Sequence, residues 1–304
     1  MKTKLIFSSF LIIFLFVLPL SAQESLKKEV PDVLVSLSSY GIVCDKSANK
    51  LYLYSSSQGS LKLIKSFSCS TGEKNGNKFR AGDKRTPEGV YFFTRRLTQG
   101  ILPKHGIMAF PLNYPNLIDK RLRKGGDGIW LHGVDKKFEK AKKLPDTKGC
   151  VAVRNKDLLE LAEIIKIKET PFIIVDKISY ASPEIIEKER EEINSFISSW
   201  KTSWESKNIA HYLSLYSQDF YSRGMDRKKW ERYKEKVISN KKFIKIKIEN
   251  LKILRYRKAN RFGDIAVCSF NQYYSSDRFK DRCKKVLYLK KQPDNWKILG
   301  EEVL

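Results

Sequence analysis

Apolar and polar side chains alternate with a period of two along residues 40–94, which is typical of β-strands. Apolar runs at residues 41–44, 51–54 and 61–69 are separated by polar or glycine-containing turns, so we expect a β-meander. A charged, glycine-rich loop at residues 70–88 precedes a further strand at residues 90–94. A loop of that length inside a compact domain is usually functional or mobile.

The pattern changes to that of a helix after the next stretch of strand-like sequence. Residues 156–167 place four apolar side chains on one helical face, and Asn155 is suited to cap this helix. Residues 171–175 are apolar throughout and predict a last, buried strand. Residues 176–182 then have the composition of a linker.

Helical periodicity dominates the start of the C-terminal half. A long amphipathic helix is expected to begin at Ser182 and Pro183, because this pair is a typical helix start. Shorter helices follow at residues 209–216 and 227–238, the second capped by Asp226. From Phe243 apolar and polar residues again alternate with a period of two, in four long runs that predict strands. Helices followed by antiparallel strands predict an α+β sheet with helices on one face.

The N-terminus has the order of a secretory signal peptide. Lys2 and Lys4 precede an apolar run at residues 5–20, and small residues around Ala22 follow. The run is short for a membrane span, so we expect cleavage after Ala22 and no stable membrane span, with a retained anchor as the alternative. The protein is then exported to the periplasm or cell wall.

The length of 304 residues and the hydrophobic content of 41% suit two ordinary domains. The predicted division is a leader (1–22), an N-terminal segment (23–39), a first domain (40–176), a linker (177–186) and a C-terminal domain (187–304).

A formal charge of +25 arises from 59 Lys and Arg against 34 Asp and Glu. In the cytoplasm this charge would favour a nucleic-acid partner. Export removes that argument, and an anionic wall polymer or membrane surface becomes the more suitable partner. A nucleic-acid binder therefore requires that the leader fail to export the protein.

Candidate nucleophilic chemistry centres on Cys150 and on His132, which precedes it by 18 residues. A thiol is an effective nucleophile only as its thiolate, and a neighbouring imidazole can take the proton. The Gly149 and Cys150 amides lie in a predicted tight turn and are candidate donors to an oxyanion.

Metal and cofactor sites are not expected. The three His and five Cys residues form no paired metal-ligand spacing. Because five is odd, at least one thiol stays unpaired within the chain, and whether the cysteines other than Cys150 pair stays open.

The sequence around these residues resembles the L,D-transpeptidases, which have a YkuD-type catalytic domain. His132-Gly133 and the run TKGCV at residues 147–151 match the active-site signature of that family. CSTG at 69–72, GDKRTPEGVYFF at 82–93 and MAFPLNYPN at 108–116 also match, in the order of the branch that includes cell-shape L,D-carboxypeptidases. The resemblance implies a β-rich catalytic domain, a mixed β-sandwich with short helices.

The C-terminal half resembles a nuclear transport factor 2-like (NTF2-like) cone, in the runs WESKNIAHYLSLYSQDF and DNWKILGEE. This fold encloses a pocket between sheet and helices, so we expect a ligand-binding or docking module rather than a second enzyme. Five aromatic residues are candidates to line the pocket or to form core: Tyr212, Tyr216, Phe220, Trp230 and Tyr273.

The resemblance also implies a reaction on peptidoglycan stem peptides. Cys150 would attack an L,D peptide bond and form a thioester, and His132, oriented by the carbonyl of Gly133, would protonate the departing D-alanine. Transfer to an amine gives a crosslink (transpeptidase), and transfer to water gives an L,D-carboxypeptidase that influences cell shape. A non-catalytic wall-binding protein is the third alternative.

The candidate substrate-binding residues include two departures from the family pattern. Lys148 stands where the family has His, and Ala152 stands where Arg is common. Arg154 is the candidate to bind the substrate carboxylate instead. The remaining candidates are Thr147 and Tyr114.

Overall fold

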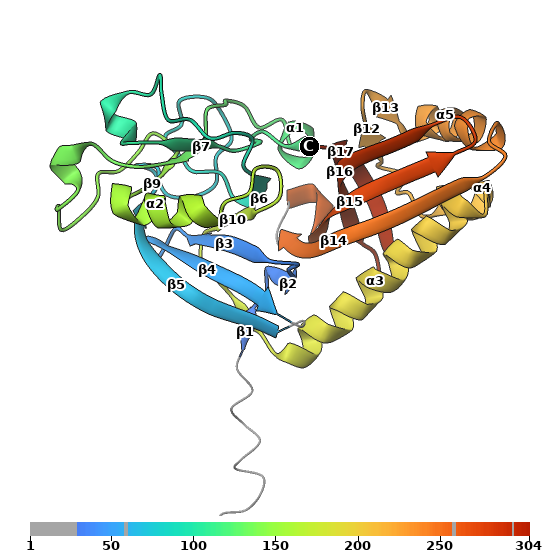
Figure 1. Ribbon diagram of the computed structural model, residues 1–304, viewed down its shortest axis with the longest axis horizontal. Coiled ribbons are helices and arrows are strands. Elements are labelled where there is room, and N and C mark those ends of the chain that lie inside the picture. Colours follow the sequence, from blue (N-terminus) through green and yellow to red (C-terminus); the bar gives the residue numbers. More distant parts are fainter. Residues whose placement is uncertain (1–28, 58–59, 257–259, 294) are drawn as a thin grey trace, which may run out of the picture.

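A computed structural model describes residues 29–57, 60–256, 260–293 and 295–304. The predicted leader at residues 1–22 lies outside the described residues. The structure has two lobes that lie side by side, each built around a β-sheet (Figure 1).

The N-terminal lobe contains an eight-stranded mixed sheet with the order β6-β10-β3-β4-β5-β9-β8-β7. Its strands are β3 (Tyr40–Asp45), β4 (Lys50–Ser57), β5 (Ser60–Ser70), β6 (Gly89–Phe92), β7 (Ala109–Pro111), β8 (Trp130–His132), β9 (Val151–Val153) and β10 (Pro171–Val175). The predicted meander is present as β3, β4 and β5, which pair antiparallel. Only β10–β3 and β8–β9 pair parallel within this sheet, as far as the chain is described.

Short helices complete this lobe: α1 (Leu117–Arg121), α2 (Asn155–Ile164) and the 3₁₀ helices Pro103–His105 and Lys136–Phe138. The prediction for α2 was wrong in two details. The helix ends at Ile164, and Asn155 does not cap it, because Asn155 is already the first helical residue. The carboxylate of Glu139 accepts hydrogen bonds from the amides of Asn155 (3.0 Å) and Lys156 (3.2 Å) and so caps the helix from a distant loop.

The C-terminal lobe has helices on one face of an antiparallel sheet, as predicted. The helices are α3 (Pro183–Glu205), α4 (Ile209–Ser214), α5 (Arg227–Ser239) and the 3₁₀ helix Asn260–Phe262. The long strands are β14 (Ile244–Tyr256), β15 (Ile265–Ser276), β16 (Lys280–Lys291) and β17 (Trp296–Val303), and a small hairpin consists of β12 (Tyr221–Ser222) and β13 (Met225–Asp226).

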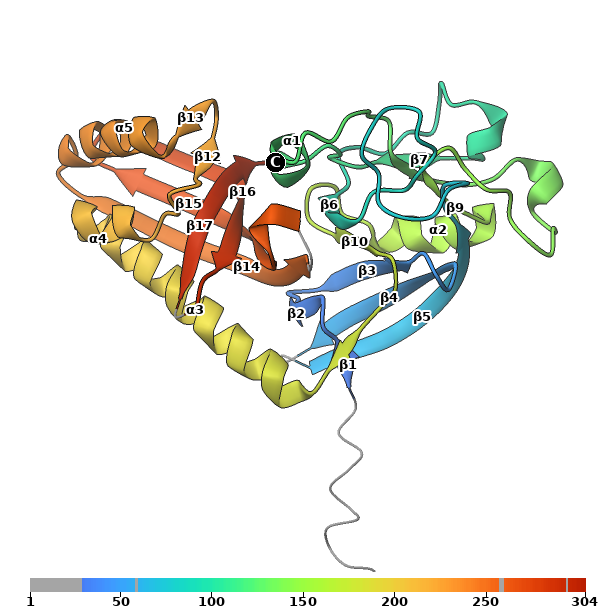
Figure 2. The same cartoon turned by 180° about the vertical axis from the view of Figure 1, so that it is seen from behind.

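The predicted helix starts in this lobe agree with the structure. Ser182 is the N-cap residue of α3, and the Asp226 side chain accepts a hydrogen bond from the Lys229 amide at the start of α5. The helix α3 begins at Pro183, within the predicted linker at 177–186. It runs along the outer side of the lobe from its start beside β1 (Figure 2).

Four of the five candidate pocket aromatics are core residues between helices and sheet: Tyr212, Tyr216, Phe220 and Trp230. Tyr273 is half-buried and belongs to a different surface, where Arg282 and Lys247 lie over its ring. The fifth aromatic residue therefore does not share the environment of the other four.

The N-terminal segment joins the two lobes. Its strand β1 (Val30–Pro31) pairs with β11 (Tyr180–Ala181), directly before α3. Its strand β2 (Leu34–Ser36) forms the edge of the C-terminal sheet, whose order is β17-β16-β15-β14-β2. The predicted division separates residues 23–39 from the C-terminal domain, whereas the structure places part of this segment in the C-terminal sheet.

An apolar cluster also continues from one lobe into the other. Val43, Val90 and Ile173 of the N-terminal sheet pack in it with residues of the C-terminal sheet such as Leu254 and Leu299. Burial of this surface stabilises one relative position of the lobes. No helix among the described residues has the length and apolar character that crossing a bilayer requires.

Candidate active site

Cys150 and His132 line one cavity of about 290 Å³. His132 is the last residue of β8, and Cys150 directly precedes β9, which pairs parallel with β8. The register places His132 opposite Ala152, so the thiol and the imidazole come from adjoining chains of the sheet. The three residues of β9 are buried and apolar, which fixes the strand beneath the cavity.

The imidazole of His132 is held in one orientation by its neighbour. Its Nδ1 lies 2.6 Å from the carbonyl oxygen of Gly133, and Nδ1–H is the donor in this contact because a carbonyl oxygen only accepts. The Nε2 atom is then the basic nitrogen of the neutral ring. Burial, with a smaller contribution from nearby His105 and Lys104, lowers the pKa of His132 to about 4. The ring is therefore neutral at pH 7 and able to accept a proton.

The Cys150 thiol donates to the carbonyl oxygen of Gly128 at 3.4 Å. Burial raises the pKa of Cys150, although a backbone hydrogen bond from Trp130 and the charge of Lys104 act in the opposite direction. No hydrogen bond joins this thiol to the imidazole in the described part of the chain. The resting site thus holds a neutral thiol and a neutral imidazole rather than an ion pair.

The turn that carries Cys150 is fixed by Thr147. The Thr147 hydroxyl donates to the carbonyl oxygen of Cys150 at 2.7 Å and accepts from the Gly149 amide at 3.0 Å. The Gly149 amide, a predicted oxyanion donor, therefore already has a partner. Gly149 has a φ of +128°, and a Cβ there would lie 2.8 Å from the Arg85 carbonyl oxygen, so this position requires glycine.

The long loop between β5 and β6 supports the same turn. The hydroxyl of Thr86, which is 1% exposed, accepts from the Gly72 amide at 2.8 Å and donates to the Cys150 carbonyl oxygen at 3.4 Å. Two threonine hydroxyls, from Thr86 and Thr147, thus converge on one carbonyl. The length of this loop predicted that it is functional or mobile, and its contacts show that it supports the Cys150 turn.

His105 and Lys104 also line the cavity, and the sequence interpretation missed both. The His105 ring lies 4.8 Å from the His132 ring and 5.0 Å from the Trp130 ring, between ring centroids. Its Nδ1 atom is buried and has no hydrogen-bond partner among the described residues. The repeated His-Gly pair, at 105–106 and 132–133, was the available signal.

Asn155 connects the two His-Gly pairs. Its Oδ1 atom accepts from the amides of Ile107 and Val134, both at 3.3 Å. A Cβ at Gly106 or at Gly133 would lie 2.2 or 2.0 Å from this oxygen, so both chains approach Asn155 as only glycine allows. Asn155 is therefore a structural link behind the cavity rather than a helix cap.

The predicted substrate-binding residues divide into two groups. Thr147 and Lys148 line the cavity, whereas Arg154 and Tyr114 do not. The Arg154 guanidinium donates to the carbonyl oxygens of Glu139 (3.2 Å) and Ala141 (2.8 Å). The Tyr114 hydroxyl donates to the Gly125 carbonyl oxygen, and this ring lines a separate cavity of about 420 Å³. The cavity at Cys150 has Lys104, Lys137 and Lys148 as its cations.

All five cysteines lie in the described ranges, and no disulfide joins them there: Cys44, Cys69 and Cys268 are buried, and Cys150 and Cys283 are half-buried. Across the described ranges, no three His, Cys, Asp or Glu side chains gather as metal ligands.

A thiol and an imidazole at adjoining strands of a mixed sheet line one cavity, and a helix-covered antiparallel sheet follows in the chain; this is the arrangement of a two-lobed protein with a candidate Cys/His site. Residues 39–174 match the family model of the L,D-transpeptidase catalytic domain, YkuD, and residues 192–302 match that of the Cds6 C-terminal NTF2-like domain. The chain belongs to the L,D-transpeptidase family and carries a C-terminal NTF2-like domain. The predicted fold class is confirmed, as is the coarse prediction of an enzyme in peptidoglycan processing.

Solved structures support this membership over nearly the whole chain. The chain is 32% identical to Bd1075 of Bdellovibrio bacteriovorus, with 91% of this chain and 98% of that one covered and a TM-score of 0.74. It is 26% identical to Pgp2 of Campylobacter jejuni, a helical cell shape determining protein, with 90% and 93% covered and a TM-score of 0.71. No curated protein sequence matches the chain.

Proposed function

We propose that this protein is an exported cysteine acyl-transfer enzyme that cleaves the L,D peptide bond before the terminal D-alanine of peptidoglycan stem peptides. The observation that carries the proposal is the shared cavity of Cys150 and His132, in which Nδ1 of His132 is occupied by Gly133 and Nε2 is basic. Membership of the L,D-transpeptidase family supplies the substrate class.

The first half-reaction begins from the neutral pair. The Cys150 sulfur turns from Gly128 toward the substrate and attacks the carbonyl carbon while Nε2 of His132 takes the thiol proton. The protonated imidazole then gives that proton to the nitrogen of D-alanine as the carbon–nitrogen bond breaks. A thioester on Cys150 and free D-alanine result. Because the pKa of His132 is lowered to about 4, its imidazolium is a stronger acid than a free imidazolium and returns its proton more readily.

The second half-reaction depends on the acceptor. An amine of a second stem or a water molecule attacks the thioester carbon, His132 takes the acceptor's proton, and the sulfur leaves and is reprotonated. An amine gives a crosslink, and water gives a shortened stem. Likeness to a helical cell shape determining protein over 90% of this chain favours trimming by water as the second candidate function.

Binding of the stem relies on groups that line the cavity. The Cys150 amide is the candidate oxyanion donor, since the Gly149 amide is bound by Thr147. Lys148 and Lys104 supply positive charge for the D-alanine carboxylate. Arg154 does not serve this role, because its guanidinium donates to backbone carbonyl oxygens. The C-terminal lobe serves as the docking part of the enzyme at the wall.

Incubation of the purified protein with defined tetrapeptide muropeptides, followed by mass analysis, tests this proposal. Free D-alanine with monomeric tripeptide identifies a carboxypeptidase, and a dimer lacking one D-alanine identifies a transpeptidase. Cys150→Ala should abolish either product while the variant stays folded. Wall binding without any product from the wild type would contradict the proposal and favour a non-catalytic wall-binding protein.

A further inference from the structure

The loop that supports the Cys150 turn has its own buried polar core. The Lys78 ammonium lies 2.8 Å from the Asp83 carboxylate, and both side chains are less than 10% exposed. The same carboxylate accepts from the amides of Phe79 (2.8 Å), Arg80 (3.1 Å) and Arg85 (3.2 Å). Ion pairing and these amides hold the pKa of Asp83 well below its usual range, despite burial. The segment at residues 78–85 is therefore a compact unit rather than a flexible strap.

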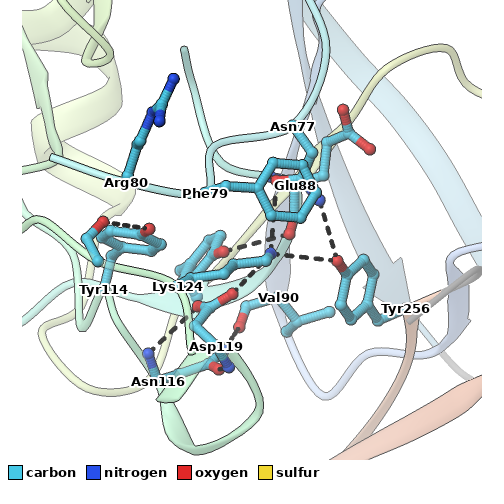
Figure 3. Close-up of polar contacts among 12 residues, drawn as sticks. Asn77, Phe79, Arg80, Glu88, Val90, Tyr114, Asn116, Asp119, Lys124 and Tyr256 are labelled. Atoms are coloured by element: carbon cyan, nitrogen blue, oxygen red, sulfur yellow. Dashed lines mark hydrogen bonds and ion pairs between the residues drawn. The ribbon is translucent and has the colours of Figure 1, made fainter. Parts of the chain in front are cut away.

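The base of this unit contacts the C-terminal lobe through Asn77 (Figure 3). The Asn77 Nδ2 atom donates to the hydroxyl of Tyr256 at 3.3 Å. Its Oδ1 atom accepts from the Glu88 amide at 2.9 Å and from the Lys124 ammonium at 3.4 Å. Tyr256 is the last residue of β14, so the Asn77 side chain joins the C-terminal sheet to both sides of the segment at residues 78–85.

A buried ion pair fixes the position of this junction. The Lys124 ammonium lies 2.8 Å from the Asp119 carboxylate, and the two side chains are 0% and 1% exposed. The same ammonium lies 3.5 Å from the Tyr256 hydroxyl. Asp119 is itself held at the start of α1, where it and Asn116 form reciprocal hydrogen bonds. Tyr256 thus meets a rigid partner rather than a mobile surface side chain.

The other end of the loop reaches the nucleophile. Glu88, whose amide is held by Asn77, is two residues from Thr86, and the Thr86 hydroxyl donates to the Cys150 carbonyl oxygen. The neighbouring Arg85 carbonyl oxygen lies under Gly149 so closely that no side chain fits there. A displacement of residues 85–88 would therefore move the turn that carries the thiol.

From these contacts we propose that Tyr256 is a positioning residue for the reaction. Through its hydroxyl and Asn77, the C-terminal lobe holds residues 85–88 under the Cys150 turn and so sets the orientation of the thiol. The inference rests on the proposed function for its kinetic consequence. It assigns to the C-terminal lobe a direct part in the geometry of the active site.

The test compares Tyr256→Phe with Tyr288→Phe. Tyr288 is the matched control, since it is buried in the same sheet and its hydroxyl donates to Glu302 (2.6 Å) rather than to the loop. We expect Tyr256→Phe to lower kcat about fivefold with KM nearly unchanged, because misplaced reacting groups lose rate rather than affinity. The rate at which iodoacetamide alkylates Cys150, followed by peptide mass mapping, should change in the same variant and not in Tyr288→Phe.

Unchanged kcat and alkylation in Tyr256→Phe, or equal changes in the two variants, would overturn the inference. Asn77→Ser provides a second route if Tyr256→Phe does not fold. In the double variant of Tyr256→Phe with Asn77→Ser, the two losses of kcat should not add, since both residues act through the same contact. Additive losses of kcat would contradict the inference. Alkylation needs no substrate, so a wild type that releases no D-alanine refutes the proposed function while the alkylation comparison still decides the role of Tyr256.

Discussion

The ring of His105 stands edge-on to the ring of His132, with the centroids 4.8 Å apart. Two imidazoles at this distance in a buried cavity oppose each other's protonation. Lys104 adds a further positive charge near both rings. The environment of His132 therefore favours the neutral, basic form that the proposed first half-reaction requires.

His105→Gln should raise the pKa of His132, because the variant removes an ionisable neighbour and leaves a neutral side chain. The rate of D-alanine release should fall on acidification at a pH that is higher than in the wild type by less than about one unit. The shift is small because burial, the larger cause of the lowered His132 pKa, remains. The pH dependence of the initial rate measures this. His211→Gln, in the exposed α4 region of the other lobe, is the control and should leave that pH unchanged.

Alkylation of Cys150 should keep rising with pH through the alkaline range. Burial raises the pKa of this thiol, and no imidazolium stands ready to stabilise the thiolate, because His132 is neutral. Peptide-resolved alkylation rates between about pH 5 and pH 10 report the titration. A plateau already reached near pH 6 would mean a preformed thiolate–imidazolium pair and would contradict the neutral resting state.

Acid should destabilise the folded protein through His132. Its pKa is lowered from 6.5 in the unfolded chain to about 4 in the fold, so the unfolded state binds the proton first as the pH falls. This contribution to stability is present above pH 6.5 and is lost progressively down to pH 4, by about 3 kcal/mol. The free energy of unfolding, measured with urea between pH 6.5 and pH 4 for the wild type and for His132→Gln, isolates this contribution. Only the wild type should show it.

Lys124→Met should be strongly destabilising because it leaves the Asp119 carboxylate buried without its cation. Breaking a buried pair by removing one partner costs about 3–5 kcal/mol, measurable by urea denaturation. Lys65→Met breaks the exposed pair with Glu160 and should cost less than about 1 kcal/mol. Similar losses in the two variants would show that burial of the Lys124–Asp119 pair does not govern its contribution.

Local sequence patterns correctly predicted those helix starts and strands that depend only on neighbouring residues. The helix starts at Ser182 and Asp226 and the β3–β5 meander depend on residues close in the chain, and the structure contains them. Asn155 has the residue type of a cap, but distant amides at Ile107 and Val134 bind its side chain. A local rule was overridden there by contacts that no local pattern contains.

In the candidate site, too, the sequence predicted what a local motif determines and missed what distant contacts determine. The motif predicted Cys150 and His132 as a reacting pair, and the two side chains line one cavity; their catalytic roles stay a proposal. Arg154 is close to Cys150 in the sequence and has a suitable charge, yet its guanidinium donates to the backbone carbonyl oxygens of Glu139 and Ala141. His105 comes from a loop far from the motif, and only folding brings it to the cavity.

The edge strand β2 has a consequence for the assembly of the chain. Leu34 emerges early in synthesis, but its partner Leu254 belongs to the final strands. The chain from β2 through the N-terminal lobe to β14 is thus closed into a ring by the non-covalent pairing of these two strands. A single backbone cut between β10 and α3 should therefore leave the two lobes associated, since the β2–β14 pairing and the shared apolar cluster still join them.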